Sequence, residues 1–227
     1  MSSELKYRIA WLILFSIAMG FLEAAVVIYL RELYYPHGFS FPLTVMDERV
    51  ALVELLREAA TVIMLIGVGV LAGHSLNQRF AFFLSSFAIW DIFYYVFLKA
   101  MIGWPDSLLT WDILFLIPVP WIGPVLAPCI ISITMLLLAT VLVYKDLQNA
   151  SNRLTPIHWT MLLTGSFIVV ASWTIDFLSY NKTMDNTMVE SMSSFVPVTY
   201  NWYLFLAGEV ILLAAVFLYG KRTSVKR

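Results

Sequence analysis

The chain has 227 residues, of which 61% are hydrophobic and only 13% are charged. A soluble domain carries roughly 25% charged residues, so the composition excludes an ordinary soluble protein and indicates one polytopic membrane domain over residues 1–227. The formal net charge of −1 provides no basic surface for nucleic acid, and the single cysteine, Cys129, excludes an intrachain disulfide.

Six apolar segments are long enough to cross a bilayer, which takes about 20 residues in a helix. In chain order they cover residues 9–30, 51–73, 80–101, 119–144, 158–179 and 202–220. The sequence therefore predicts an all-α fold with six transmembrane helices.

Prolines crowd the entrance to the fourth segment, at Pro118, Pro120, Pro124 and Pro128. Proline removes a backbone donor and kinks a helix, and irregular backbone survives in lipid only where it is buried in protein or lines a polar cavity. We therefore expect residues 109–121 to form an interfacial or partly re-entrant segment.

The distribution of basic residues between connections predicts the orientation. With six spans, nine of them fall on the side of the termini: Lys6, Arg8, Arg79, Lys145, Arg153, Lys221, Arg222, Lys226 and Arg227. The other side receives Arg31, Arg49 and Lys182, with Arg57 and Lys99 close to helix ends. This bias predicts cytoplasmic termini, and we expect the membrane to be a plasma membrane of bacterial type.

The second span begins with three charged side chains in its outer third, Glu54, Arg57 and Glu58. Residues three and four apart share a helix face, so two carboxylates flank one guanidinium.

Seven of the fifteen acidic residues lie within or at the edge of predicted spans, all in the middle or outer half: Glu23, Glu54, Glu58, Asp91, Asp112, Asp176 and Glu209. An ionised side chain in the bilayer costs roughly 2.5–3.5 kcal/mol, so these groups should face the interior. We expect one polar cavity near the outer face, where carboxylates meet one another, water, or the bases Arg31, Arg57 and Lys99. If each base pairs once, four carboxylates remain to be protonated, hydrated or bound to a cation.

A purely structural alternative stands beside this prediction. Arg57 with Glu54 or Glu58, and Lys99 with Asp112, could be ion pairs that only lock helices together. In the stretch around Asp91, Tyr94 and Tyr95 lie three and four residues further on, so either phenol could orient this carboxylate or simply pack.

Sequence motifs give little help with cofactors. No motif for haem, NAD or zinc appears in the chain, whereas carboxylates leave an all-oxygen site for a divalent cation such as Mg²⁺ open.

Three hypotheses follow, and the sequence does not decide whether the protein is an enzyme. The favoured one is an enzyme acting on a lipid or another hydrophobic small molecule, with Glu58, Asp91, Glu54 and Tyr94 as catalytic residues. Substrate-binding residues would be Arg57, which would hold an anionic group, together with Glu23, Lys99, Asp112 and Arg31. The alternatives are a proton- or cation-coupled transporter and a non-catalytic subunit bound to a membrane-protein partner.

Overall fold

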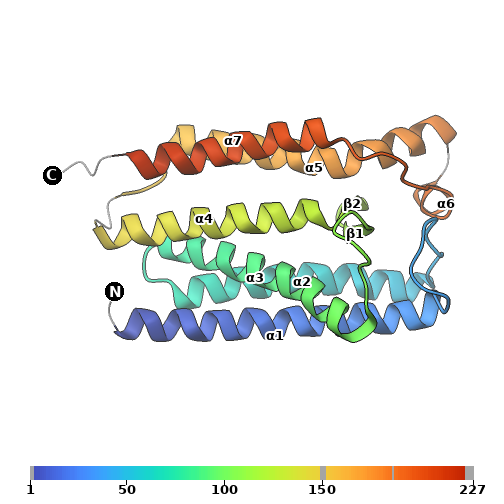
Figure 1. Ribbon diagram of the computed structural model, residues 1–227, viewed down its shortest axis with the longest axis horizontal. Coiled ribbons are helices and arrows are strands. Elements are labelled where there is room, and N and C mark those ends of the chain that lie inside the picture. The colour runs from blue at the N-terminus through green and yellow to red at the C-terminus, as the bar shows by residue number, and fades with distance from the viewer. Residues whose placement is uncertain (1–2, 149–151, 186, 223–227) are drawn as a thin grey trace.

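The computed structural model describes residues 3–148, 152–185 and 187–222, and six long helices run side by side along an elongated bundle in it (Figure 1). They are α1 (Ser3–Tyr34), α2 (Glu48–Ala72), α3 (Leu76–Ile102), α4 (Leu126–Gln148), α5 (Pro156–Met184) and α7 (Trp202–Lys221). Each is long and apolar enough to cross a membrane, so the predicted all-α polytopic architecture is confirmed.

The described ends of the chain lie together at one end of the bundle (Figure 1). We call this the termini end, and we call the opposite end, which carries the loop 35–47 and the short helix α6 (Met188–Met192), the far end. Lys226 and Arg227, which contribute to the predicted charge bias, lie outside the described residues.

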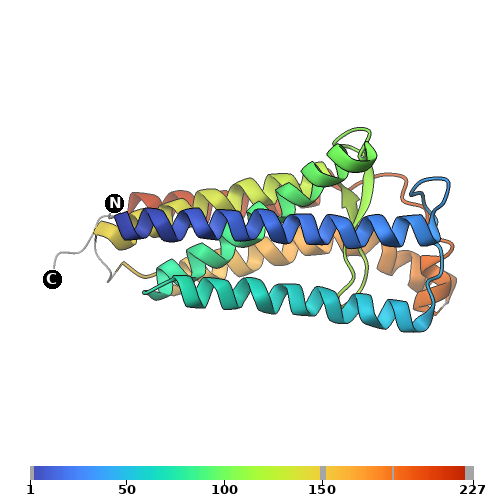
Figure 2. The same ribbon diagram turned by 90° about the horizontal axis from the view of Figure 1, so that it is seen from below.

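Helix α3 lies at the centre of one half of the bundle, where it packs against α1, α2 and α4. The other half is the pair α5–α7, which α4 joins to α3 (Figures 1 and 2). Helices α5 and α7 approach closely at two glycines: a Cβ atom on Gly208 would lie 2.8 Å from the carbonyl oxygen of Gly165. Small residues permit this approach because lipid provides no hydrophobic force to press helices together.

A two-stranded antiparallel hairpin precedes α4, formed by β1 (Trp111–Phe115) and β2 (Trp121–Pro124). The prediction that the fourth span starts at residue 119 is therefore wrong, because residues 121–124 pair as a strand and the helix begins only at Leu126. Pairing gives the backbone of this proline-rich stretch hydrogen-bond partners that an interrupted helix would lack. Figure 2 shows the hairpin inserted among the helices, with its tip directed toward α2.

Candidate functional site

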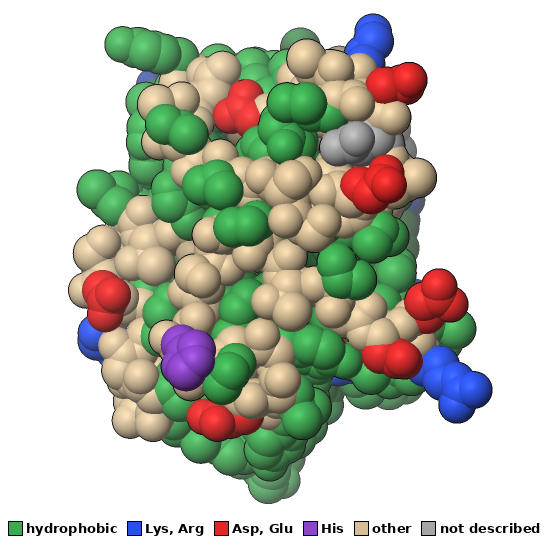
Figure 3. All heavy atoms as spheres, turned by 90° about the vertical axis from the view of Figure 1, so that its right-hand side faces the viewer, with side chains coloured by type: hydrophobic (Ala, Val, Ile, Leu, Met, Phe, Trp, Pro, Cys, Tyr) green, Lys and Arg blue, Asp and Glu red, His purple; other side chains and the backbone are tan. Residues whose placement is uncertain are grey.

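A cavity lies at the far end, between α1, α2, α3, strand β1 and the loop 35–47. It contains about 940 Å³ of atom-free space, part of which is open to the outside. On the outer surface of this end, acidic and hydrophobic side chains lie interspersed (Figure 3). We call this space the far-end cavity.

Most of the candidate site residues line the far-end cavity. They are Glu23, Arg31, Glu54, Arg57, Glu58, Asp91, Tyr94 and Asp112. Five carboxylates and two guanidinium groups therefore share one space, and if all were ionised the carboxylates would exceed the bases by three charges.

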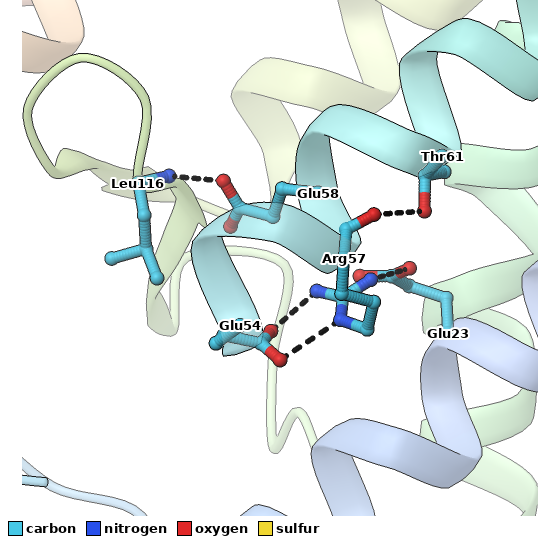
Figure 4. Close-up of polar contacts among 6 residues, drawn as sticks. All are labelled: Glu23, Glu54, Arg57, Glu58, Thr61 and Leu116. Atoms are coloured by element: carbon cyan, nitrogen blue, oxygen red, sulfur yellow. Dashed lines mark hydrogen bonds and ion pairs between the residues drawn. The ribbon is translucent and has the colours of Figure 1, made fainter. Parts of the chain in front are cut away.

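Arg57 holds two carboxylates at once (Figure 4). Its Nε donates to Glu54 Oε2 at 2.9 Å, its Nη2 pairs with Glu54 Oε1, and its Nη1 pairs with Glu23 Oε2. The first contact follows from the i, i+3 spacing, whereas Glu23 comes from α1 and so ties two helices together. Each of the three guanidinium nitrogens has a carboxylate partner, so Arg57 is occupied in positioning Glu23 and Glu54.

Glu58 has no basic partner among the described residues. Its Oε2 accepts a hydrogen bond of 2.9 Å from the backbone N–H of Leu116, at the tip of the hairpin (Figure 4). The residue is 7% exposed, and its second carboxylate oxygen takes part in no hydrogen bond or ion pair in the described part of the chain. Glu58 thus anchors the hairpin with one oxygen and leaves the other available to the cavity.

Asp91 is held in the same manner. Its Oδ2 accepts from the hydroxyl of Ser132 on α4 at 2.8 Å, and within the described ranges its other oxygen has no hydrogen-bond or charged partner. Of the two alternatives for the following tyrosines, the structure shows no hydrogen bond from Tyr95 to Asp91, because Tyr95 donates to Asp112 Oδ2 at 3.2 Å. Tyr94 lines the cavity with its ring 4.8 Å from that of Tyr95.

Arg31 and Asp112 form the outermost ion pair of the site, with Arg31 Nη2 3.3 Å from Asp112 Oδ1. The guanidinium carbon lies 3.7 Å from the ring centroid of Trp104 and 4.5 Å from that of Phe39. Both partners are buried, at 9% and 2% exposed, and such stacking on aromatic faces favours a desolvated cation. Arg31 Nη1 nevertheless has no hydrogen-bond partner in the described residues.

Lys99 lies outside the far-end cavity. Its Nζ donates to the carbonyl oxygens of Gly103 and Pro105, each at 2.8 Å, and so caps the end of α3. The alternative in which Lys99 pairs with Asp112 is therefore wrong, since Arg31 takes that carboxylate.

Asp176 and Glu209 also lie away from this cavity, contrary to the expectation of a single polar space for all seven acids. Asp176 borders a separate hollow beside Tyr180 and Phe195. Glu209 on α7 is buried and accepts from the Thr134 hydroxyl on α4 with Oε1, while its Oε2 has no hydrogen-bond partner in the described part of the chain. The expectation failed because their helices, α5 and α7, form the other half of the bundle.

Sequence reasoning missed two partners that fix the site, Ser132 and the backbone of Leu116. A serine in an apolar helix and a loop N–H carry no signal of their own. Only the positions of α4 and the hairpin relative to α2 and α3 reveal them.

The described residues contain no group of three or more histidine, cysteine, aspartate or glutamate side chains arranged to hold a metal ion. Comparison with known proteins gives no further guidance, since no protein-family model, no curated protein and no solved structure matches the chain.

Proposed function

We propose that this protein is a membrane-embedded enzyme that carries out acid–base chemistry on a lipid or another hydrophobic substrate in the far-end cavity. The observation that carries this proposal is the state of Glu58 and Asp91. Each lines the far-end cavity, accepts a hydrogen bond from a single neutral donor, and has a second oxygen with no hydrogen-bond or charged partner among the described residues. A positioned carboxyl group of this kind can give or take a proton within a hydrogen bond of a substrate atom.

The other charged residues have supporting roles in this proposal. Arg57 keeps Glu23 and Glu54 in place through one contact from each of its three nitrogens, and the second N–H of each terminal nitrogen remains for an anionic group of the substrate. Arg31 holds Asp112, and the Tyr95 hydroxyl donates to that same carboxylate. Tyr94 supplies a further phenol on the cavity wall.

The test is turnover by Glu58→Gln and Asp91→Asn. The purified protein in lipid nanodiscs would be incubated with a total bacterial lipid extract, and products would be followed by mass spectrometry. Loss of a general acid or base lowers rates by about 10²–10⁴-fold, and we expect that loss in both variants. Glu209→Gln is the matched control, since it neutralises a buried acid that does not line the cavity, and it should keep full turnover.

Two results would contradict the proposal. One is the same product profile with both variants as with the parent protein. The other is an equal loss in the Glu209→Gln control, which would indicate damage to the fold.

We further propose that both termini face the cytoplasm, so that the far-end cavity opens toward the outer side. The support is the charge bias: the loops and helix ends of the termini end carry Lys6, Arg8, Arg79, Lys145, Arg153, Lys221 and Arg222. Fusions of a reporter that is active only in the cytoplasm, placed at the carboxyl terminus and in the 35–47 loop, test this orientation. We expect activity from the fusion at the carboxyl terminus. Activity from the loop fusion would contradict the proposed orientation.

A further inference from the structure

A second cavity lies between α3, α4, α5 and α7, on the termini side of the hairpin. It contains about 740 Å³ of atom-free space, and its walls are mainly aliphatic and aromatic. Phe87, Met135 and Val170, from three of its helices, each lie near the middle of their helix. We call it the mid-bundle cavity, because in a spanning bundle this level is the hydrocarbon core.

The mid-bundle cavity adjoins the far-end cavity. Trp90, Asp91, Leu114 and Phe115 line both spaces. Asp91 therefore stands at their junction, and the Ser132 hydroxyl that fixes it belongs to the wall of the mid-bundle cavity. One molecule could place a polar group beside Asp91 and an apolar chain in the mid-bundle cavity.

Depth and wall chemistry define what occupies the mid-bundle cavity. Water in an apolar space lacks the two to four polar partners that it needs, whereas the surrounding bilayer supplies hydrocarbon chains. Ser166 on α5 is exposed at the edge of this space, so the wall has an opening on the surface of the bundle.

The charges of the far-end cavity define the polar group at the other end of that molecule. Five carboxylates face two guanidinium groups, and all three nitrogens of Arg57 already have carboxylate partners. When these carboxylates are ionised, a positively charged head would reduce the excess of negative charge, whereas an anionic head would add to it.

We propose that the mid-bundle cavity binds the hydrocarbon chain of an amphiphile whose positively charged, ammonium-bearing head lies in the far-end cavity beside Asp91. This inference rests on the proposed function, because it names the class of substrate for the same site. The chain site itself is a binding property and is measured without turnover.

The experiment uses two photoactivatable probes with the same diazirine-bearing alkyl chain, a long-chain amine and a long-chain carboxylate. Each would be added to the full-length protein in nanodiscs, and labelled peptides would be mapped by mass spectrometry. We expect the amine to label peptides containing Met135 and Val170 at a concentration about tenfold lower than the carboxylate. Asp91→Asn should reduce this preference for the amine.

Ser166→Phe fills the opening of the mid-bundle cavity and should abolish the labelling by both probes. Thr164→Phe is the matched control, because it adds the same ring to an exposed position of α5 that lines neither cavity. Both probes should label this variant as strongly as they label the parent protein. Val170→Trp is a second blocking variant, because the larger side chain would fill the mid-bundle cavity from its α5 wall.

Labelling that persists in both blocking variants would overturn the chain site. Labelling that the blocks remove but that favours the carboxylate, or shows no preference, would overturn the ammonium head. Failure of the proposed function is distinguishable from both, because it would leave the labelling pattern intact while Glu58→Gln and Asp91→Asn retain turnover.

Discussion

Two buried carboxylates at opposite ends of the bundle, Asp146 and Glu58, differ in how many of their oxygens have hydrogen-bond partners. At the termini end, Asp146 accepts from the Ser75 hydroxyl with one oxygen and from the Gln78 amide with the other, each at 2.6 Å. Lys145 donates to the carbonyl of Arg222 at 2.7 Å. These groups are satisfied by helix ends and turns, which is what stabilisation of a fold requires.

At the far end, Glu58 and Asp91 each use one oxygen. Arg31 Nη1 is a buried donor without a partner among the described residues, which costs free energy unless a ligand accepts a hydrogen bond from it. The comparison teaches that position in the membrane alone does not mark a functional acid. What separates Asp146 from Glu58 and Asp91 is that both of its carboxylate oxygens accept hydrogen bonds, whereas only one oxygen of each of the others does among the described residues.

The largest expected effect is that of Arg57→Met. Removing one partner of a buried charge pair costs about 3–5 kcal/mol, and because the Arg57 side chain is 20% exposed we expect about 3 kcal/mol. Thermal unfolding in mild detergent would measure the loss. The variant that also carries Glu23→Gln and Glu54→Gln should recover most of the stability, and failure to recover would mean that Arg57 acts by packing and not by balancing those two carboxylates.

The next effect concerns the termini end. Asp146→Ala removes two hydrogen bonds to a carboxylate, and we expect a loss of about 2–3 kcal/mol in the free energy of unfolding with no change in turnover. Asp146→Asn is its control, because the amide still meets Ser75. If Asp146→Ala changed the product profile at equal stability, the assignment of a purely structural role to this end would fall.

The smallest expected effect on stability is that of replacing Glu58, which both accepts a hydrogen bond from the hairpin and is proposed to transfer a proton. Glu58→Leu leaves the Leu116 N–H without its acceptor, which should cost about 1–3 kcal/mol. Glu58→Gln keeps a carbonyl oxygen for that N–H and should remain close to the parent in stability while losing turnover. Equal thermal unfolding of the two variants would show that the hairpin does not depend on this contact.

Several features of this protein were accessible from local sequence patterns. Hydropathy depends on composition over about 20 residues, so the six spans could be predicted, although the fourth helix begins at Leu126 and not at residue 119. The contact of Arg57 with Glu54 follows from spacing on one helix, and the structure shows it. The positions of the acidic residues along the spans also follow directly from the sequence.

Only the tertiary structure decided which of those groups meet. The partners Arg31 and Asp112 are 81 positions apart, and Glu58 meets a backbone N–H 58 positions away. The hairpin at 111–124 was hidden because strand pairing satisfies a proline-rich backbone that the sequence pattern alone assigned partly to a helix. Local sequence determines which segments enter the membrane, whereas the packing of α3 against α1, α2 and α4 determines which side chains share a cavity, because contacts between distant segments depend on every helix at once.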